Sequence, residues 1–497
     1  MNNNPSENGL TPREAAEEVL KRQPLEPLAV LRYRSEGRLL VLGSSVAIEA
    51  IIDRLPALPG IYIAAIDIFS PTLSARLLER GFAGRDALSE ISIKGWMGRF
   101  RVNATHGTDL LCLEELFGLG GSGFDLILDL CDPCLSPSPA VPIGYFAVGS
   151  SNENRLARAL TELPLCVGEL IKPQYVQFKH QPCDHHHADT VMCRRCLDVC
   201  ETWAISSVDQ QITLNPYLCQ GCGDCATVCP TGAFQFAYPP VEYALLRIGA
   251  MLSIYHEHGG KTPILLLHDR SRGRDWFLEH RARLPINILP FEVESLGSTG
   301  MELWLMALAQ GASQVLILDA RAQNHKTRQM ILSQVRAAQA ILRSLGYPDG
   351  LIRLIGPDDL TATLLPLRPV RTVEPILAAY EGQDKRSLIS AAIQHLQFQP
   401  LTDASVALPE GGFFGAVRVD ADSCTLCMHC VTLCPESALM TVDDGPGLAF
   451  IESNCIQCGG CVGGCPEQAI ALEPRFLFDR AVATRLALVK QGRGQTP

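Results

Sequence analysis

The sequence has more acidic than basic residues and no long apolar run. Its 42 lysine and arginine residues are outnumbered by 53 aspartate and glutamate residues, so the net charge is −11 at pH 7. Nucleic-acid binding needs a basic face, and this balance argues against a nucleic-acid partner. No apolar run approaches the ~18 residues of a membrane span. The polar N-terminus also lacks the basic and apolar regions of an export signal, so we expect a cytoplasmic protein with no integral membrane segment.

The motifs of several enzyme classes are missing as well. We find no serine-nucleophile elbow, no Walker phosphate loop and no CxxCH haem motif. The turn "GSS" at Gly43 follows a predicted strand but is not a G-x-G-x-x-G dinucleotide fingerprint. The sequence therefore predicts no substrate site of a familiar kind, and we expect the chemistry to reside in a partner.

Cysteine is abundant in two short stretches and scarce elsewhere. Of the 20 cysteines, eight lie in residues 183–229 and eight in residues 424–465, whereas residues 230–423 contain none. Disulfides are rare in reducing compartments. The distribution therefore predicts two separate cysteine-built modules on a scaffold that is otherwise poor in cysteine.

The second module repeats one ligand pattern. "CTLCMHCVTLCP" and "CIQCGGCVGGCP" both read C-x2-C-x2-C-x3-C-P, the run of bacterial dicluster ferredoxins, in which the fourth cysteine ligates the other cluster. Zinc sites usually use two separated pairs of ligands and fit this spacing poorly. We expect two [4Fe–4S] clusters here, one on Cys424, Cys427, Cys430 and Cys465 and the other on Cys455, Cys458, Cys461 and Cys434.

The first module has one clean run and one altered run. "CQGCGDCATVCP" matches the pattern, whereas the upstream "CDHHHADTVMCRRCLDVC" keeps C-x2-C-x3-C but displaces its first cysteine. Residues 184–192 then form a loop insertion, which costs little free energy. We expect one cluster on Cys183, Cys193, Cys196 and Cys229 and another on Cys219, Cys222, Cys225 and Cys200.

Histidines in the insertion leave the identity of one cluster ligand undecided. His185, His186 and His187 are adjacent and cannot all face one metal, so a solvated loop is the simpler interpretation. A histidine such as His185 could still replace Cys183 as the displaced ligand.

Arg194 and Arg195 place positive charge beside the predicted Cys193 cluster. Positive charge favours the more negative reduced form and raises the reduction potential. We therefore predict that this cluster titrates above the Cys219 cluster. The alternative is a pair of arginines that faces solvent.

Four cysteines lie outside the modules. Cys131 and Cys134 form "CDPC", a spacing that a redox dithiol can use. It lacks the helix start expected after the first cysteine, so we do not assign it a catalytic role. Cys112 and Cys166 have apolar neighbours in the sequence and are expected in the core.

The apolar pattern predicts α/β and α+β parts. Runs such as "GRLLVLG", "FDLILDL", "PILLLH" and "QVLILDA" have strand length and alternate with helical segments. We expect two α/β domains with parallel sheets, interleaved with two ferredoxin-like dicluster domains. The expected order is a tail at 1–24 that leads into a short helix, an α/β domain at 25–170, a dicluster domain at 171–240, an α/β domain at 241–372, a helical linker at 373–400, a dicluster domain at 401–475, and a C-terminal helix and tail at 476–497.

Three family resemblances add to this interpretation. The cysteine runs resemble bacterial-type 2[4Fe–4S] ferredoxins, which implies a βαβ repeat with pseudo-two-fold symmetry. "GSTGMELWLMALAQGASQVLILDA" resembles the delta subunit of methyl-viologen-reducing hydrogenase over residues 262–346. That family carries a [2Fe–2S] cluster on cysteines absent here, so the resemblance implies a scaffold or docking surface.

The third resemblance concerns the whole layout. "VPIGYF", "VGELIKPQYVQFKHQPC", "CRRCLDVC" and "LCQGCGDCATVCPTGAFQFAYP" resemble a family of multi-cluster ferredoxin-like proteins associated with bacterial formate dehydrogenases. This resemblance implies formate dehydrogenase as a redox partner.

These observations favour an electron-transfer protein with four [4Fe–4S] clusters, which exchanges electrons with a redox enzyme and other electron carriers. Two alternatives are an oxidoreductase subunit with its own site, at "CDPC" or a flavin, and an assembly or redox-sensing accessory protein.

Overall fold

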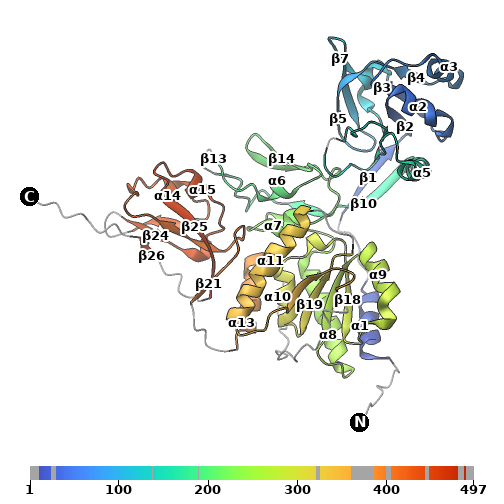
Figure 1. The fold of residues 1–497 in the computed structure, drawn as a ribbon. Helices are drawn as coiled ribbons and strands as arrows, with labels where there is room; N and C mark the ends of the chain where they lie inside the picture. The colour runs from blue at the N-terminus through green and yellow to red at the C-terminus, as the bar shows by residue number, and fades with distance from the viewer. Residues whose placement is uncertain are drawn as a thin grey trace, which may run out of the picture.

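The structure is a computed structural model with described residues 10–23, 29–136, 138–187, 190–320, 325–359, 384–398, 404–442, 447–478 and 486–488. It is a mixed α/β protein with two parallel sheets and two cysteine-containing modules (Figure 1). In the described residues no helix is both long and apolar enough to cross a lipid bilayer.

The first parallel sheet is built around a fully buried central strand. The four residues Leu39–Leu42 have no exposed surface, as expected for a strand covered on both faces. Ser44 and Ser70 accept backbone N–H bonds at the starts of the helices that follow two strands. In spatial order the strands are β4 (Ala83–Arg85), β3 (Gly60–Ala65), β2 (Arg38–Gly43), β8 (Leu126–Asp129) and β9 (Tyr145–Ala147), with helices α2 (Ser45–Ile51), α3 (Pro71–Arg80), α4 (Leu113–Leu116) and α5 (Glu153–Glu162).

Two antiparallel additions extend this part. β1 (Val30–Ser35) pairs with β10 (Gly168–Pro173), which brings the entry and the exit of the segment together. β5 (Ser89–Lys94), β6 (Arg101–His106) and β7 (Asp109–Cys112) form a three-stranded meander.

The second parallel sheet packs against a helix that is buried on every side. All nine residues of α10 (Met301–Ala309) are buried, because α8, α11, α13 and the sheet pack around it. The sheet order is β18 (Ile288–Val293), β17 (Ile264–Asp269), β19 (Gln314–Leu318) and β20 (Ile352–Ile355), and the helices are α8 (Val241–Glu257), α9 (Arg272–His280), α11 (His325–Ser344) and α13 (Lys385–Leu396).

Residues 12–21 of the expected N-terminal tail are a packed helix. Residues 12–21 form α1 (Pro12–Lys21), which begins at a capping box between Thr11 and Glu14. This helix packs on α8 and β18 of the second sheet, far along the chain. Its buried face, with Ala15 and Ala16, explains the docking, because this apolar stripe needs a partner.

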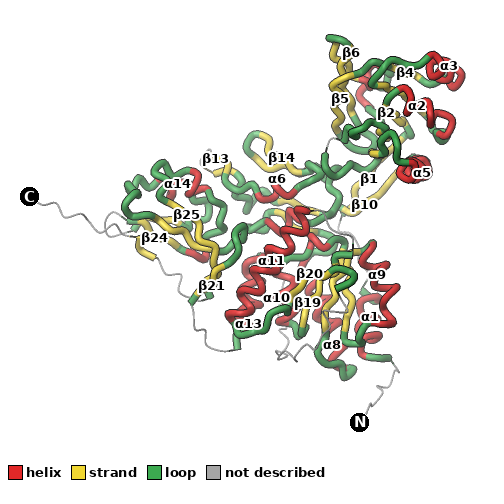
Figure 2. The backbone as a smooth tube through the Cα atoms, viewed as in Figure 1, coloured by secondary structure: helices red, strands yellow, loops and turns green. Residues whose placement is uncertain are grey.

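Each cysteine module repeats a strand–helix–strand unit (Figure 2). In both modules the first and last strands pair antiparallel. The first module contains β11 (Val176–Phe178), β12 (His186–His187), β13 (Thr190–Val191), α6 (Arg195–Val199), β14 (Ile205–Val208), β15 (Gln211–Leu214), α7 (Asp224–Val228) and β16 (Phe234–Phe236). The second contains β21 (Ser405–Ala407), β22 (Gly415–Val419), α14 (His429–Leu433), β23 (Leu439–Thr441), β24 (Leu448–Phe450), α15 (Gly460–Gly463) and β25 (Ile470–Leu477).

The C-terminal helix expected at 476–497 is wrong where the structure describes that segment. β25 continues to Leu477, and β26 (Leu486–Leu488) pairs antiparallel with β24. The backbone of this strand gives β24 a second hydrogen-bonding neighbour, which a helix could not provide. The rest of the expected helix lies outside the described residues.

The first module lies at the centre of the molecule (Figure 1). Toward the first sheet, Tyr33 and Lys172 donate hydrogen bonds to the carbonyl of Tyr217, at 2.6 and 3.2 Å. Toward the second sheet, Thr227 donates to the carbonyl of Gly297 at 2.7 Å. The central module is therefore fixed by polar contacts on both sides.

Candidate metal centres

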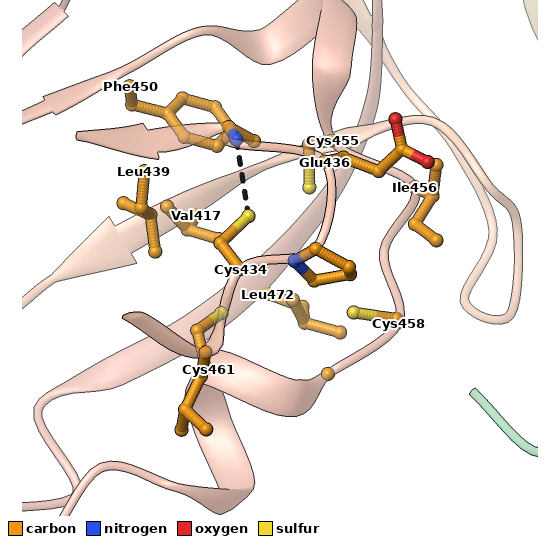
Figure 3. Close-up of a pocket in the computed structure, with 14 residues that line it drawn as sticks. Val417, Cys434, Glu436, Leu439, Phe450, Cys455, Ile456, Cys458, Cys461 and Leu472 are labelled. Atoms are coloured by element: carbon orange, nitrogen blue, oxygen red, sulfur yellow. Dashed lines mark hydrogen bonds between the residues drawn. The ribbon is translucent and has the colours of Figure 1, made fainter. Parts of the chain in front are cut away.

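The structure brings three of the four predicted cysteine sets together, each around one cavity. We name the four sets site A (Cys183, Cys193, Cys196, Cys229), site B (Cys219, Cys222, Cys225, Cys200), site C (Cys424, Cys427, Cys430, Cys465) and site D (Cys455, Cys458, Cys461, Cys434). The space between protein atoms, part of it open to solvent, is about 330 Å³ in the site A cavity, 320 Å³ in the site C cavity and 380 Å³ in the site D cavity. Figure 3 shows the four cysteines of site D around their cavity.

The members of site B interact electrostatically. Burial is the largest cause that raises the pKa of Cys225 well above its usual value, and charge on Cys222, Cys219 and Cys200 adds to the effect. Cys222 is influenced by Cys219 and Cys200 in the same way. Charge on Cys196 of site A also raises the pKa of Cys225, so the thiols of sites A and B interact within the module.

Short helices explain why the fourth cysteine of a run leaves its own set. The helices α6, α7 and α14 each contain the third cysteine of a run and are capped at the C-terminus by the fourth. At Cys200, Cys229 and Cys434 the backbone is extended, with ψ of 101°, 116° and 106°. An extended cap ends the helical turn, so the fourth side chain is directed away from the first three.

Hydrogen bonds to sulfur prepare the cysteines for a charged state. The backbone N–H of Ala438 donates to Cys434 Sγ at 3.2 Å, and that of Ala469 donates to Cys465 Sγ at 3.4 Å. The Gln457 side-chain amide donates to Cys455 Sγ at 3.3 Å. Such donors stabilise thiolate ligands and tune the potential of a bound cluster.

Burial of the thiols explains why a cationic group suits these sites. Burial raises the pKa of Cys193 to about 11 and is the largest cause that raises the pKa of Cys461 to about 12. A buried thiolate is costly without a neighbouring positive charge, and the irons of a cluster provide that charge. The donor sets of four cysteines around a cavity therefore fit [4Fe–4S] clusters.

His185 is committed to other partners. It is only 3% exposed, and its Nδ1 donates to the carbonyl of Cys193 at 2.7 Å. Because a carbonyl only accepts, Nδ1 carries the proton and Nε2 accepts from Ser207 Oγ at 2.8 Å. Cys183 and His185 both line the site A cavity, but both ring nitrogens of His185 are already engaged in these hydrogen bonds. The insertion is also not a simple solvated loop, since His186 and His187 form β12, which pairs with β13.

The two adjacent arginines differ. Arg194 is exposed, and its guanidinium lies 3.9 Å from the carboxylate of Asp198. Arg195 is half-buried, and its guanidinium donates to three carbonyls of the second module. The alternative of a solvent-facing pair therefore holds for Arg194 alone. The contacts of Arg195 span more than two hundred residues of sequence, so no local signal could have predicted them.

The "CDPC" pair lies in an unfavourable place for a redox dithiol. Burial is the largest cause that raises the pKa of both thiols, and the charge of Asp129 adds to it. A dithiol nucleophile needs a lowered pKa.

Cys112 and Cys166, expected in the core, are only partly buried. Cys166 packs against the hydrophobic core around the first parallel sheet.

One glycine-rich run escaped the sequence interpretation. "GLGGSG" at residues 118–123 does match G-x-G-x-x-G. It forms a turn, Gly120–Ser122, that precedes β8. The dinucleotide fingerprint instead connects a strand to a following helix, so this run does not have the required geometry.

Comparisons with known proteins identify both modules. Two family models, each described as a 4Fe-4S dicluster domain, match residues 191–233 and 423–470. The "Ferredoxin-type protein NapF" of Escherichia coli (strain K12) is 46% identical over 54 residues, which are 10% of this chain and 33% of the relative. The protein named "Putative oxidoreductase AegA" of the same strain is 36% identical over 83 residues, which are 16% of this chain and 12% of the relative.

Because both family models match, the chain contains two 4Fe-4S dicluster ferredoxin domains. The stretches that match the two relatives cover about a third or less of the relatives' length. The names of the relatives include neither formate dehydrogenase nor hydrogenase, so the two resemblances that point to those enzymes stay predictions.

Proposed function

We propose that the chain is an iron–sulfur electron-transfer protein that holds four [4Fe–4S] clusters, one each at sites A, B, C and D, and relays electrons to or from a redox partner enzyme. The main support is that cysteines from two different runs line a common cavity at sites A, C and D. A bound cluster supplies one-electron transfer, and the chain's own residues bind it and tune its potential.

The number of thiols argues for transfer rather than catalysis. Four cysteines at each site occupy one position on every iron of a cubane, so no iron is left open for substrate. The raised pKa of Cys131 and Cys134 disfavours the alternative of a second, thiol-based reaction.

For the rest of the chain we propose two α/β domains, at 25–170 and 241–372, that hold the modules, with residues 12–21 packed on the second. We also propose a cytoplasmic location and formate dehydrogenase as the partner. The partner rests on the resemblance of segments such as "VGELIKPQYVQFKHQPC" and "VPIGYF".

Anaerobic purification followed by iron, sulfide and zinc analysis and by EPR spectroscopy tests the proposal. We expect about sixteen irons per chain, four for each [4Fe–4S] cluster, and reversible reduction. About twelve irons with zinc bound at site A would refute the four-cluster assignment. Formate and formate dehydrogenase should then bleach the visible absorption, and full reduction by dithionite without reduction by this pair would refute the partner alone.

A further inference from the structure

Sites A and D face each other across the contact between the two modules. Arg195 lines the site A cavity and immediately precedes Cys196. Its guanidinium donates to the carbonyls of Gly411 at 2.5 Å, Gly412 at 2.8 Å and Gln457 at 2.9 Å. Gln457 immediately precedes Cys458 of site D, so one side chain reaches from the wall of one site to the loop of the other.

Arg195 lies between the two sites. It lines the site A cavity together with Cys193 and Cys229. The Gln457 carbonyl that accepts from its guanidinium belongs to the residue before Cys458 of site D. Arg195 is therefore positioned to act on both sites.

Close packing holds the modules in this position. A Cβ atom at Gly460, in α15, would lie 2.3 Å from Met192 Cε. Gly460 lies between Cys458 and Cys461, and Met192 immediately precedes Cys193. The backbone of site D thus directly contacts the residue that leads into site A.

We propose that Arg195 is a shared positioning residue that raises the reduction potential at sites A and D together and joins the two modules into one series, with the sites in the order B, A, D, C. This inference rests on the proposed function, because it requires clusters at both sites. Within each module the neighbouring sites exchange their fourth cysteines. Between the modules, sites A and D provide the contact.

The sign of the effect follows from charge. Reduction of a cluster adds one negative charge, which a fixed guanidinium stabilises. The three carbonyl acceptors hold the Arg195 guanidinium in place. Arg194 provides the matched control, because its side chain is 63% exposed and solvent screens its charge.

The test is an EPR-monitored redox titration of the full chain in four forms: wild type, Arg195→Gln, Arg194→Gln and Arg195→Lys. We expect two of the cluster signals to shift to lower potential in Arg195→Gln, each by roughly tenfold in the reduction equilibrium, which is ~59 mV for one electron. Arg194→Gln should shift neither. Arg195→Lys, which keeps the charge, should restore most of the loss.

A variant without the site D cluster shows which site gives the second shifted signal. When Cys455→Ala removes the cluster of site D, the number of signals that Arg195→Gln shifts should fall from two to one. A shift confined to site A, or no shift, would overturn the inference. In that case about sixteen irons and reversible reduction would leave the proposed function intact, whereas their loss in the wild-type chain would refute the proposed function itself.

A second variant covers the case in which Arg195→Gln does not assemble. Gly412 is partly exposed, its φ is not positive, and a Cβ atom there would meet only the carbonyl oxygen of Pro409, at 3.7 Å. Gly412→Asp therefore adds a negative charge beside Arg195 without removing any of its contacts. We expect both potentials to fall by less than in Arg195→Gln, and unchanged potentials in a fully loaded protein would overturn the inference.

Discussion

The ligand of site A can be tested by two substitutions in the altered cysteine run. Cys183→Ala removes a thiol that lines the site A cavity. The iron content should then fall from about sixteen to about twelve per chain, or to about fifteen if three thiols retain a [3Fe–4S] cluster with its own EPR signal. The folded scaffold should change little, because the loss is confined to one cluster.

His185→Ala should have the opposite effect. The imidazole makes two hydrogen bonds, to the Cys193 carbonyl and the Ser207 hydroxyl. With a net value of ~1 kcal/mol for each bond and a penalty of ~1–2 kcal/mol for the carbonyl left unsatisfied, the loss of stability is about 3–4 kcal/mol. Iron content should stay at the wild-type value, while the melting temperature of the loaded protein falls.

Metal analysis, EPR and thermal unfolding under anaerobic conditions measure these effects on the same samples. Ser207→Ala is the matched control, since it removes one hydrogen bond of His185 and leaves the imidazole in place. If His185→Ala loses one cluster while Cys183→Ala keeps all its iron, the histidine is the ligand and the reasoning is refuted.

Three further substitutions test other parts of the structure. Cys200→Ala should remove the cluster of site B and leave site A loaded, and EPR showing the reverse would contradict the exchange of fourth cysteines. Asp125 is fully buried and accepts two hydrogen bonds from the Arg38 guanidinium, at 2.9 and 2.8 Å. Asp125→Ala should therefore destabilise the first sheet by about 3–5 kcal/mol in thermal or denaturant unfolding, and a loss below that of an exposed ion pair would contradict this. Cys134→Ser should leave iron content and reduction kinetics unchanged, because burial and Asp129 raise the pKa of that thiol, and slower electron transfer would show that the thiol participates.

The sequence predicts those features whose cause is local. The ligand runs specify dicluster domains because the spacing of thiolates along a few turns determines what they can bind. Family models match both domains, so this prediction is confirmed. Strands such as β17 and β19 are also readable, since a strand buried on both faces is apolar at nearly every position.

The features that sequence could not predict depend on distant partners. α1 is amphipathic by pattern, but nothing near it indicates that it packs on α8. Residues 486–488 form a strand only because β24 has a free edge. Arg194 and Arg195 are equivalent as letters, and their different roles follow from the second module, more than two hundred residues away.

The unequal exposure of the cysteines has a consequence for the protein in air. Cys427 of site C is exposed, whereas Cys225 of site B is buried and packed against the first module's core. Dioxygen and chelators attack exposed ligands first, so we expect damage to begin at site C and to proceed inward. A preparation handled in air would thus lose the outermost carrier first, and the protein would fail as a relay while most of its iron was still bound.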